Sequence, residues 1–121
     1  MSMKKELVLV EEFHQKFNQP VLKEPSTPPE TRYTFRHKLM LDEVNEYLDE
    51  LTNGAAPPQV AKELADILYA VYGTILEHGL QDKMEDVFCE VHRSNMSKDF
   101  HQYKMIKGKS YTPAHVEQFF E

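Results

Sequence analysis

The chain has 121 residues, which is enough for one domain with a hydrophobic core and too short for two ordinary domains. It contains 14 Lys and Arg against 20 Asp and Glu, a formal net charge of −6. This charge balance disfavours binding of a nucleic-acid polymer, which depends on neutralising phosphates. An apolar fraction of 40%, with seven Phe and six Tyr, is typical of a folded protein. We therefore expect a single domain over residues 1–121.

The sequence also argues against secretion and membrane insertion. The single cysteine, Cys89, cannot form an internal disulfide, which fits a reducing compartment. No apolar run approaches the roughly 18 residues that a membrane-spanning helix needs. Glu11 and Glu12 interrupt the N-terminal segment before the apolar core of a signal peptide could form. We expect a cytoplasmic protein with no membrane association.

Apolar residues recur at helical spacing in four segments. The helices expected from this spacing cover about residues 4–18, 28–53, 58–78 and 82–95. Thr27 is a candidate N-cap for the second helix, because Glu30 follows it by three residues and the two prolines between them are tolerated in a first turn. Gly54 is expected to end that helix in a left-handed conformation, and Gly79 to close the third.

The second and third expected helices are long and have only a short connection, residues 55–58, between them. Such a pair packs antiparallel. After residue 95 the helical pattern breaks into a short, irregular, basic segment with at most a small hairpin. The expected fold class is therefore all-α, a four-helix bundle.

Two pairs of acidic residues lie on the long helices, Glu43 with Glu46 and Glu63 with Asp66. Residues three apart share a helix face, so antiparallel packing can bring all four carboxylates together. They would repel one another, and a divalent cation compensates for that; carboxylate oxygens suit Mg²⁺ or Mn²⁺. The alternative is a solvated acidic face, which is common. The apolar surroundings of the second pair, in residues 60–71, favour the metal site, because buried charges are usually paired.

This acidic pattern resembles the E-x-x-E…E-x-x-D signature of the all-α nucleoside triphosphate pyrophosphohydrolases, the MazG-like and phosphoribosyl-ATP pyrophosphohydrolase-like proteins. Three further segments are similar to these proteins. They are Lys62-Glu-Leu-Ala-Asp-Ile-Leu-Tyr69, Val91-His-Arg-Ser-Asn-Met-Ser-Lys98, and Gly108-Lys109 followed by Tyr111-x-Pro113.

The resemblance implies a MazG-like fold and Mg²⁺-dependent hydrolysis of a nucleoside triphosphate to a monophosphate and pyrophosphate, with a role in nucleotide-pool housecleaning. It implies that the two acidic pairs hold the metal, that Mn²⁺ can substitute, and that the protein is a homodimer or a dimer of dimers. Many members begin the motif with two glutamates, where this chain has Asp42-Glu43. The water-activating base therefore stays open among Asp42, Glu43 and Glu46. The alternatives are a nucleotide-binding regulatory module with little or no turnover, and a helical dimer with a solvated acidic face.

Candidate substrate contacts come from two regions. The resemblance assigns phosphate or nucleotide contacts to Arg93, Asn95, Lys98 and Lys109, where the alternative is a basic segment that only keeps the surface soluble. Near the N-terminus, His14 and Phe17 are candidates, with Phe13, for the wall of a nucleobase pocket. At helical spacing, such aromatic residues are also typical of a core.

Overall fold

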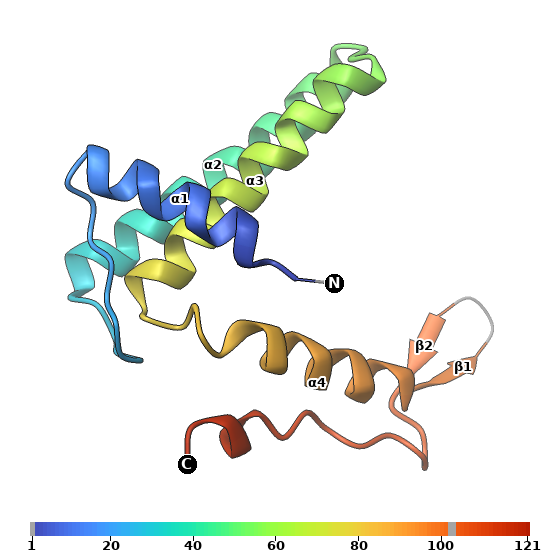
Figure 1. The fold of residues 1–121 in the computed structure, drawn as a ribbon. Coiled ribbons are helices and arrows are strands. Elements are labelled where there is room, and N and C mark those ends of the chain that lie inside the picture. The colour runs from blue at the N-terminus through green and yellow to red at the C-terminus, as the bar shows by residue number, and fades with distance from the viewer. Residues whose placement is uncertain (1, 102–103) are drawn as a thin grey trace. The chain divides into compact units, whose positions relative to one another are not determined.

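The computed structural model describes residues 2–101 and 104–121 (Figure 1). These form two compact units, Met1–Gln81 and Asp82–Glu121, and each is described by itself. The described chain is mostly helical, with four α-helices and one two-stranded sheet, which confirms the all-α class. No helix in the described ranges is long and apolar enough to cross a membrane.

The first unit contains α1 (Lys4–Lys16), α2 (Glu30–Thr52) and α3 (Pro57–Glu77). The helices α2 and α3 run antiparallel, and α1 packs across α3 (Figure 1). The predicted helices are confirmed, with ends that differ by no more than two residues. The first helix stops before its predicted end because Asn18 adopts a φ of 54°, in the left-handed region.

The second helix begins at Glu30, later than predicted, and Thr27 does not cap it. Pro29 is extended, with ψ of 153°, and occupies the cap position. Because Pro29 is extended, the helical conformation starts only at the next residue, Glu30. At the other end, Gly54 has a φ of 80°, the left-handed conformation that was predicted for it.

The core of the first unit contains an ion pair among apolar side chains. Leu7, Val10, Ala70, Ile75 and Leu76 are its buried apolar members. Beside them the fully buried Glu77 carboxylate lies 2.8 Å from Arg32 Nη2 and 3.3 Å from Arg36 Nη1.

Arg36 also ties α2 directly to α3. It donates hydrogen bonds to the Ala70 carbonyl (2.8 Å) and to Thr74 Oγ1 (3.1 Å). A Cβ at Gly73 would lie 2.5 Å from Arg36 Nη2, so only glycine leaves room for the guanidinium. Because its partners are spread over two turns of α3, Arg36 fixes how far α2 slides along α3.

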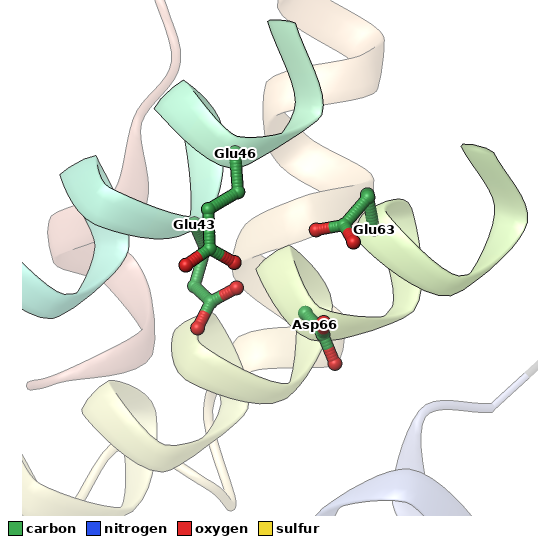
Figure 2. A group of neighbouring side chains, drawn as sticks. All are labelled: Glu43, Glu46, Glu63 and Asp66. Atoms are coloured by element: carbon green, nitrogen blue, oxygen red, sulfur yellow. The ribbon is translucent and has the colours of Figure 1, made fainter. Parts of the chain in front are cut away.

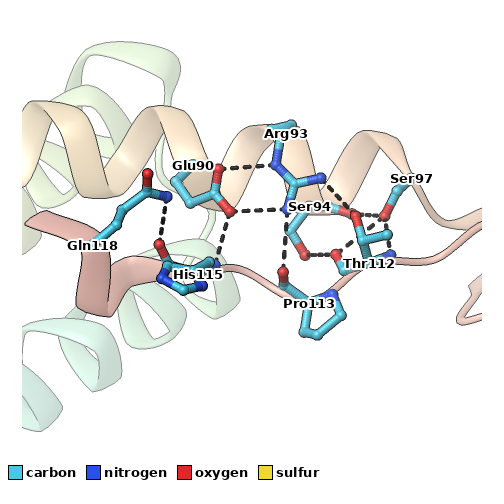
Figure 3. A network of polar contacts seen from close by, with 8 residues as sticks. All are labelled: Glu90, Arg93, Ser94, Ser97, Thr112, Pro113, His115 and Gln118. Carbon is cyan, nitrogen blue, oxygen red and sulfur yellow. Dashed lines mark hydrogen bonds and ion pairs between the residues drawn. The ribbon is translucent and has the colours of Figure 1, made fainter.

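The second unit contains α4 (Met84–Met96), the antiparallel strands β1 (Asp99–His101) and β2 (Lys104–Ile106), and the 3-10 helix η1 (Val116–Phe119). The helix was predicted over residues 82–95 and lies slightly further along the chain. The segment before η1 is tied to α4 by hydrogen bonds (Figure 3). Ser94 Oγ donates to the Thr112 carbonyl at 2.8 Å, and the His115 N–H donates to Glu90 at 2.8 Å.

Candidate metal centre

The structure brings together four carboxylates from the two antiparallel helices (Figure 2). Glu43 and Glu46 come from α2, and Glu63 and Asp66 come from α3. Each offers one oxygen, and these oxygens all lie within 4.8 Å of one another. A separation of this size lets a single cation contact several of the acids.

Two of these acids are poorly compensated within the protein. Glu63 is only 7% exposed and Glu43 is half-buried. Among the described residues, neither Glu43 Oε2 nor Glu63 Oε2 has a hydrogen-bond partner, although both atoms are buried. Burial raises the pKa of Glu43, and the charges of the neighbouring acids and a hydrogen bond with Glu46 raise it further. Buried, unpaired carboxylate oxygens that face one another fit a hard divalent cation.

A lysine lies at the edge of this cluster. Lys62 Nζ is 2.7 Å from Asp66 Oδ2 and 3.8 Å from Glu63 Oε1. Its hydrogen bond with Asp66, and then the charges of Asp66 and Glu63, raise the pKa of Lys62. The ammonium therefore offsets part of the negative charge of the cluster.

A pocket of about 210 Å³ adjoins the acids on the side of α1. Glu43 and Asp66 line it together with Phe13, His14, Arg36 and Tyr69. The rings of Phe13 and Tyr69 meet edge to face, with 5.5 Å between their centroids. An aromatic pocket beside a polar cluster suits a flat, partly apolar ligand group.

Of the three residues predicted for the aromatic pocket, Phe13 and His14 line it and Phe17 does not. His14 lines the pocket, is 2% exposed, and pairs its Nδ1 with the Pro20 carbonyl at 2.9 Å. Phe17 is 52% exposed and packs against Phe13 with 4.8 Å between centroids, outside the residues that line the pocket. Tyr69, which lies on α3 like Asp66, lines the pocket instead.

The structure places the remaining predicted residues away from the four acids or in the second unit. Asp42 is exposed on α2, and its Oδ2 lies 2.9 Å from Lys38 Nζ. It is not one of the clustered acids. Asn95 is exposed on α4, Lys98 is half-exposed after it, and Lys109 is exposed. Their role in substrate binding stays a prediction.

Arg93, in the same unit, is engaged by protein groups (Figure 3). Its guanidinium contacts Glu90 at 2.8 and 2.9 Å, and donates to Thr112 Oγ1 at 2.6 Å and to the Pro113 carbonyl at 3.1 Å. These bonds hold the C-terminal segment on α4. A phosphate contact by Arg93 therefore requires that some of them be exchanged, and this role too stays a prediction.

Three residues of the site were not predicted. Arg36 is seven residues before Glu43, a spacing that places both on one helix face, and this signal was available. Lys62 is four residues before Asp66, which predicts an ion pair. Tyr69 is three residues after Asp66, on the same face of α3, but its facing partner comes from α1 and cannot be read from spacing.

The fold and the site together define an all-α protein with a candidate carboxylate metal centre beside an aromatic pocket. The chain matches the phosphoribosyl-ATP pyrophosphohydrolase family over residues 10–95, which is more than half of its length. It belongs to that family, within the MazG-like all-α nucleoside triphosphate pyrophosphohydrolases, and this confirms the resemblance seen in the sequence. The family name describes hydrolases of acid anhydrides in nucleotide-like substrates. No curated protein matches the chain.

Proposed function

We propose that the protein is a divalent-metal-dependent nucleoside triphosphate pyrophosphohydrolase, which converts a (d)NTP and water to a (d)NMP and pyrophosphate. The observation that carries this proposal is the cluster of four carboxylates within 4.8 Å, two of which have buried oxygens without a partner in the described chain. Membership of a pyrophosphohydrolase family supports the reaction class.

Glu43, Glu46, Glu63 and Asp66 would hold Mg²⁺, with Mn²⁺ as a substitute. When bound, the ion supplies positive charge to the phosphate oxygens and makes a coordinated water more acidic. A carboxylate accepts the proton of the attacking water as it adds to the α-phosphorus, and pyrophosphate leaves. Because Lys38 already pairs with Asp42 away from the cluster, we assign the base to Glu43 or Glu46.

In this proposal the nucleobase lies in the pocket that Phe13 and Tyr69 line. Aromatic side chains can stack on any nucleobase, because every base has a flat π-face. Glu43 and Asp66 line both the pocket and the acidic cluster, so a ligand seated there has its phosphates beside the acids. We propose housecleaning of the nucleotide pool as the biological role, as the family resemblance implies.

We also propose that the protein functions as a homodimer or a dimer of dimers. Apolar side chains at helical spacing are exposed on α2 and α3 of the single chain. They are Leu41, Val44, Leu48, Leu51, Leu64, Leu68 and Val71, each at least 36% exposed. Exposed apolar side chains repeated at helical spacing along a helix favour an interface. Light scattering coupled to size-exclusion chromatography is expected to give a mass of two or four chains, and a monomer at micromolar concentration would contradict it.

Pyrophosphate release from a panel of canonical and modified (d)NTPs, with millimolar Mg²⁺ or Mn²⁺, tests the proposed activity. We expect release from at least one nucleotide and none in the presence of EDTA. Metal-dependent nucleotide binding without release would instead favour a regulatory nucleotide-binding module. If neither metal supports release or changes the melting temperature, the acids are a solvated face and the proposal is wrong.

A further inference from the structure

The acidic cluster lies between two pockets of different chemistry. The aromatic pocket contacts it at Glu43 and Asp66. A second pocket, of about 240 Å³, contacts it at Glu63 and is otherwise lined by Glu50, Pro58, Gln59 and Lys62. These residues belong to the end of α2 and the beginning of α3. On this side the Lys62 ammonium and the Gln59 amide offer donors to an anion beside the Glu50 carboxylate, so an anion that carries its own cation fits better than a free one. The aromatic side offers surfaces to a ring.

Lys62 is the residue that links the second pocket to the acids. Its ammonium is 2.7 Å from Asp66 Oδ2, yet its side chain is 68% exposed. Glu63, at 3.8 Å, has a side chain that is only 9% exposed. An exposed lysine therefore pairs with the partly exposed Asp66, whose side chain is 32% exposed, at the edge of the acidic cluster. An exposed ion pair of this type is weak enough to exchange partners.

The Asp66 carboxylate cannot pair with Lys62 and bind a divalent cation with full strength at the same time. An ion held by the four acids would satisfy the Asp66 carboxylate and repel the nearby ammonium. The displaced ammonium has an alternative location in the second pocket, which it already lines. There it would meet an anion that approaches the cation from this side.

We propose that Lys62 is an exchangeable counter-ion: it neutralises Asp66 in the metal-free protein, is displaced when a divalent cation binds, and then holds the terminal phosphates of a polyphosphate in the second pocket. This inference rests on the proposed function, because it assumes that the four acids bind a cation. If Lys62 acts in this way, the substrate lies with its base toward α1 and its phosphate tail toward the connection between α2 and α3.

The test separates the two roles of Lys62 by the sign of their effects. We expect Lys62→Met to bind Mn²⁺ alone about three- to tenfold more tightly, since a competitor is lost. The same variant, saturated with Mn²⁺, should bind Mn²⁺–tripolyphosphate about tenfold more weakly, since a phosphate ligand is lost. Calorimetry, with electron paramagnetic resonance of free Mn²⁺, measures both affinities without turnover. Lys62→Arg should remain close to the unmodified protein in the phosphate measurement.

Lys38→Met is the matched control, because Lys38 forms the same kind of exposed pair, with Asp42 four residues later, outside the cluster. It should leave both affinities within about twofold. Equal effects of the two Met variants, or Lys62→Met effects that are absent or of the same sign, overturn the counter-ion role. If the unmodified protein binds Mn²⁺ and only the Lys62 effects fail, the proposed metal centre survives. If it binds no Mn²⁺, both proposals fail.

Discussion

Replacement of Glu43 by Gln is expected to stabilise the metal-free protein, although it removes a residue of the candidate centre. Two unit charges 4.8 Å apart repel by about 3 kcal/mol at an effective dielectric constant of 20, and by about 1 kcal/mol in water. Glutamine keeps the shape of the side chain, so the packing of α2 on α3 is unchanged. Lys62 and dissolved cations offset part of the repulsion, and we expect a net gain of about 1 kcal/mol, or about 4 °C in Tm.

The pH dependence of this gain has a defined sign. Because the pKa of Glu43 is raised in the folded protein, the folded state binds more protons than the unfolded state above the ordinary value of 4.5. The free energy of unfolding of the metal-free protein therefore falls as pH rises from about 4.5 through the raised pKa. Glu43→Gln removes this dependence, so its advantage should grow over the same interval and then stay constant.

Metal should reverse the order of the two proteins. At a concentration of 100 times Kd, an ion stabilises the unmodified protein by about 2.7 kcal/mol, or about 10 °C, whereas the variant has lost a ligand. Scanning calorimetry in EDTA and in Mn²⁺ measures both states. Asp49→Asn, an equal change in charge at an exposed position of α2, is the control and should show neither effect. A Glu43→Gln protein that is less stable than the unmodified protein in EDTA would refute the electrostatic reasoning.

Three further changes test other parts of the structure. Glu63→Gln should abolish pyrophosphate release with an unchanged far-ultraviolet circular dichroism spectrum, and near-normal activity would show that the metal is bound elsewhere. Gly73→Ala should cost about 2 kcal/mol in urea unfolding, because its methyl group would lie 2.5 Å from Arg36 Nη2; an unchanged midpoint would contradict the close packing. A hydrogen bond with Arg93, and then one from a backbone N–H, lower the pKa of Glu90 to about 2. Docking of the C-terminal segment should therefore be complete above pH 4.5 and be lost as pH falls toward 2, as hydrogen exchange can measure. Protection that stays constant down to pH 2 would rule out this role for Glu90.

The helices and the meeting of the acids were predictable because both depend on local spacing. Apolar periodicity identified all four helices of the described chain, and Gly54 marked a helix end through a conformation that few other residues adopt. Given an antiparallel pair, the two acidic motifs needed only the right register to face one another. The error at Pro28 was also local: proline is tolerated in a first turn, and the Pro-Pro pair at 57–58 does begin α3, whereas at 28–29 the second proline is extended and the helix begins after it.

The surroundings of the acids were not predictable, because they depend on contacts between distant residues. Tyr69 faces Phe13 across two helices, and no spacing within α3 shows that it lines a pocket. Arg93 was interpreted as a phosphate ligand from the resemblance, although Glu90, three residues earlier on α4, was a local sign of an ion pair. The other partners of Arg93, Thr112 and Pro113, lie about twenty residues later in an irregular segment and could not be read from spacing.

The buried ion pair explains how four like charges can be held together without metal. Arg36 is two turns before Glu43 on α2, and its bonds to Ala70, Thr74 and Glu77 extend along α3 from the turn after Asp66. Sliding α2 along α3 to separate the acids would break these bonds and leave a charge buried without its partner, which is costly. The attraction near one end of the helix pair thus opposes the repulsion nearer its middle. A cation then enters a site whose carboxylates are already in place, so little of its binding energy is lost in assembling them.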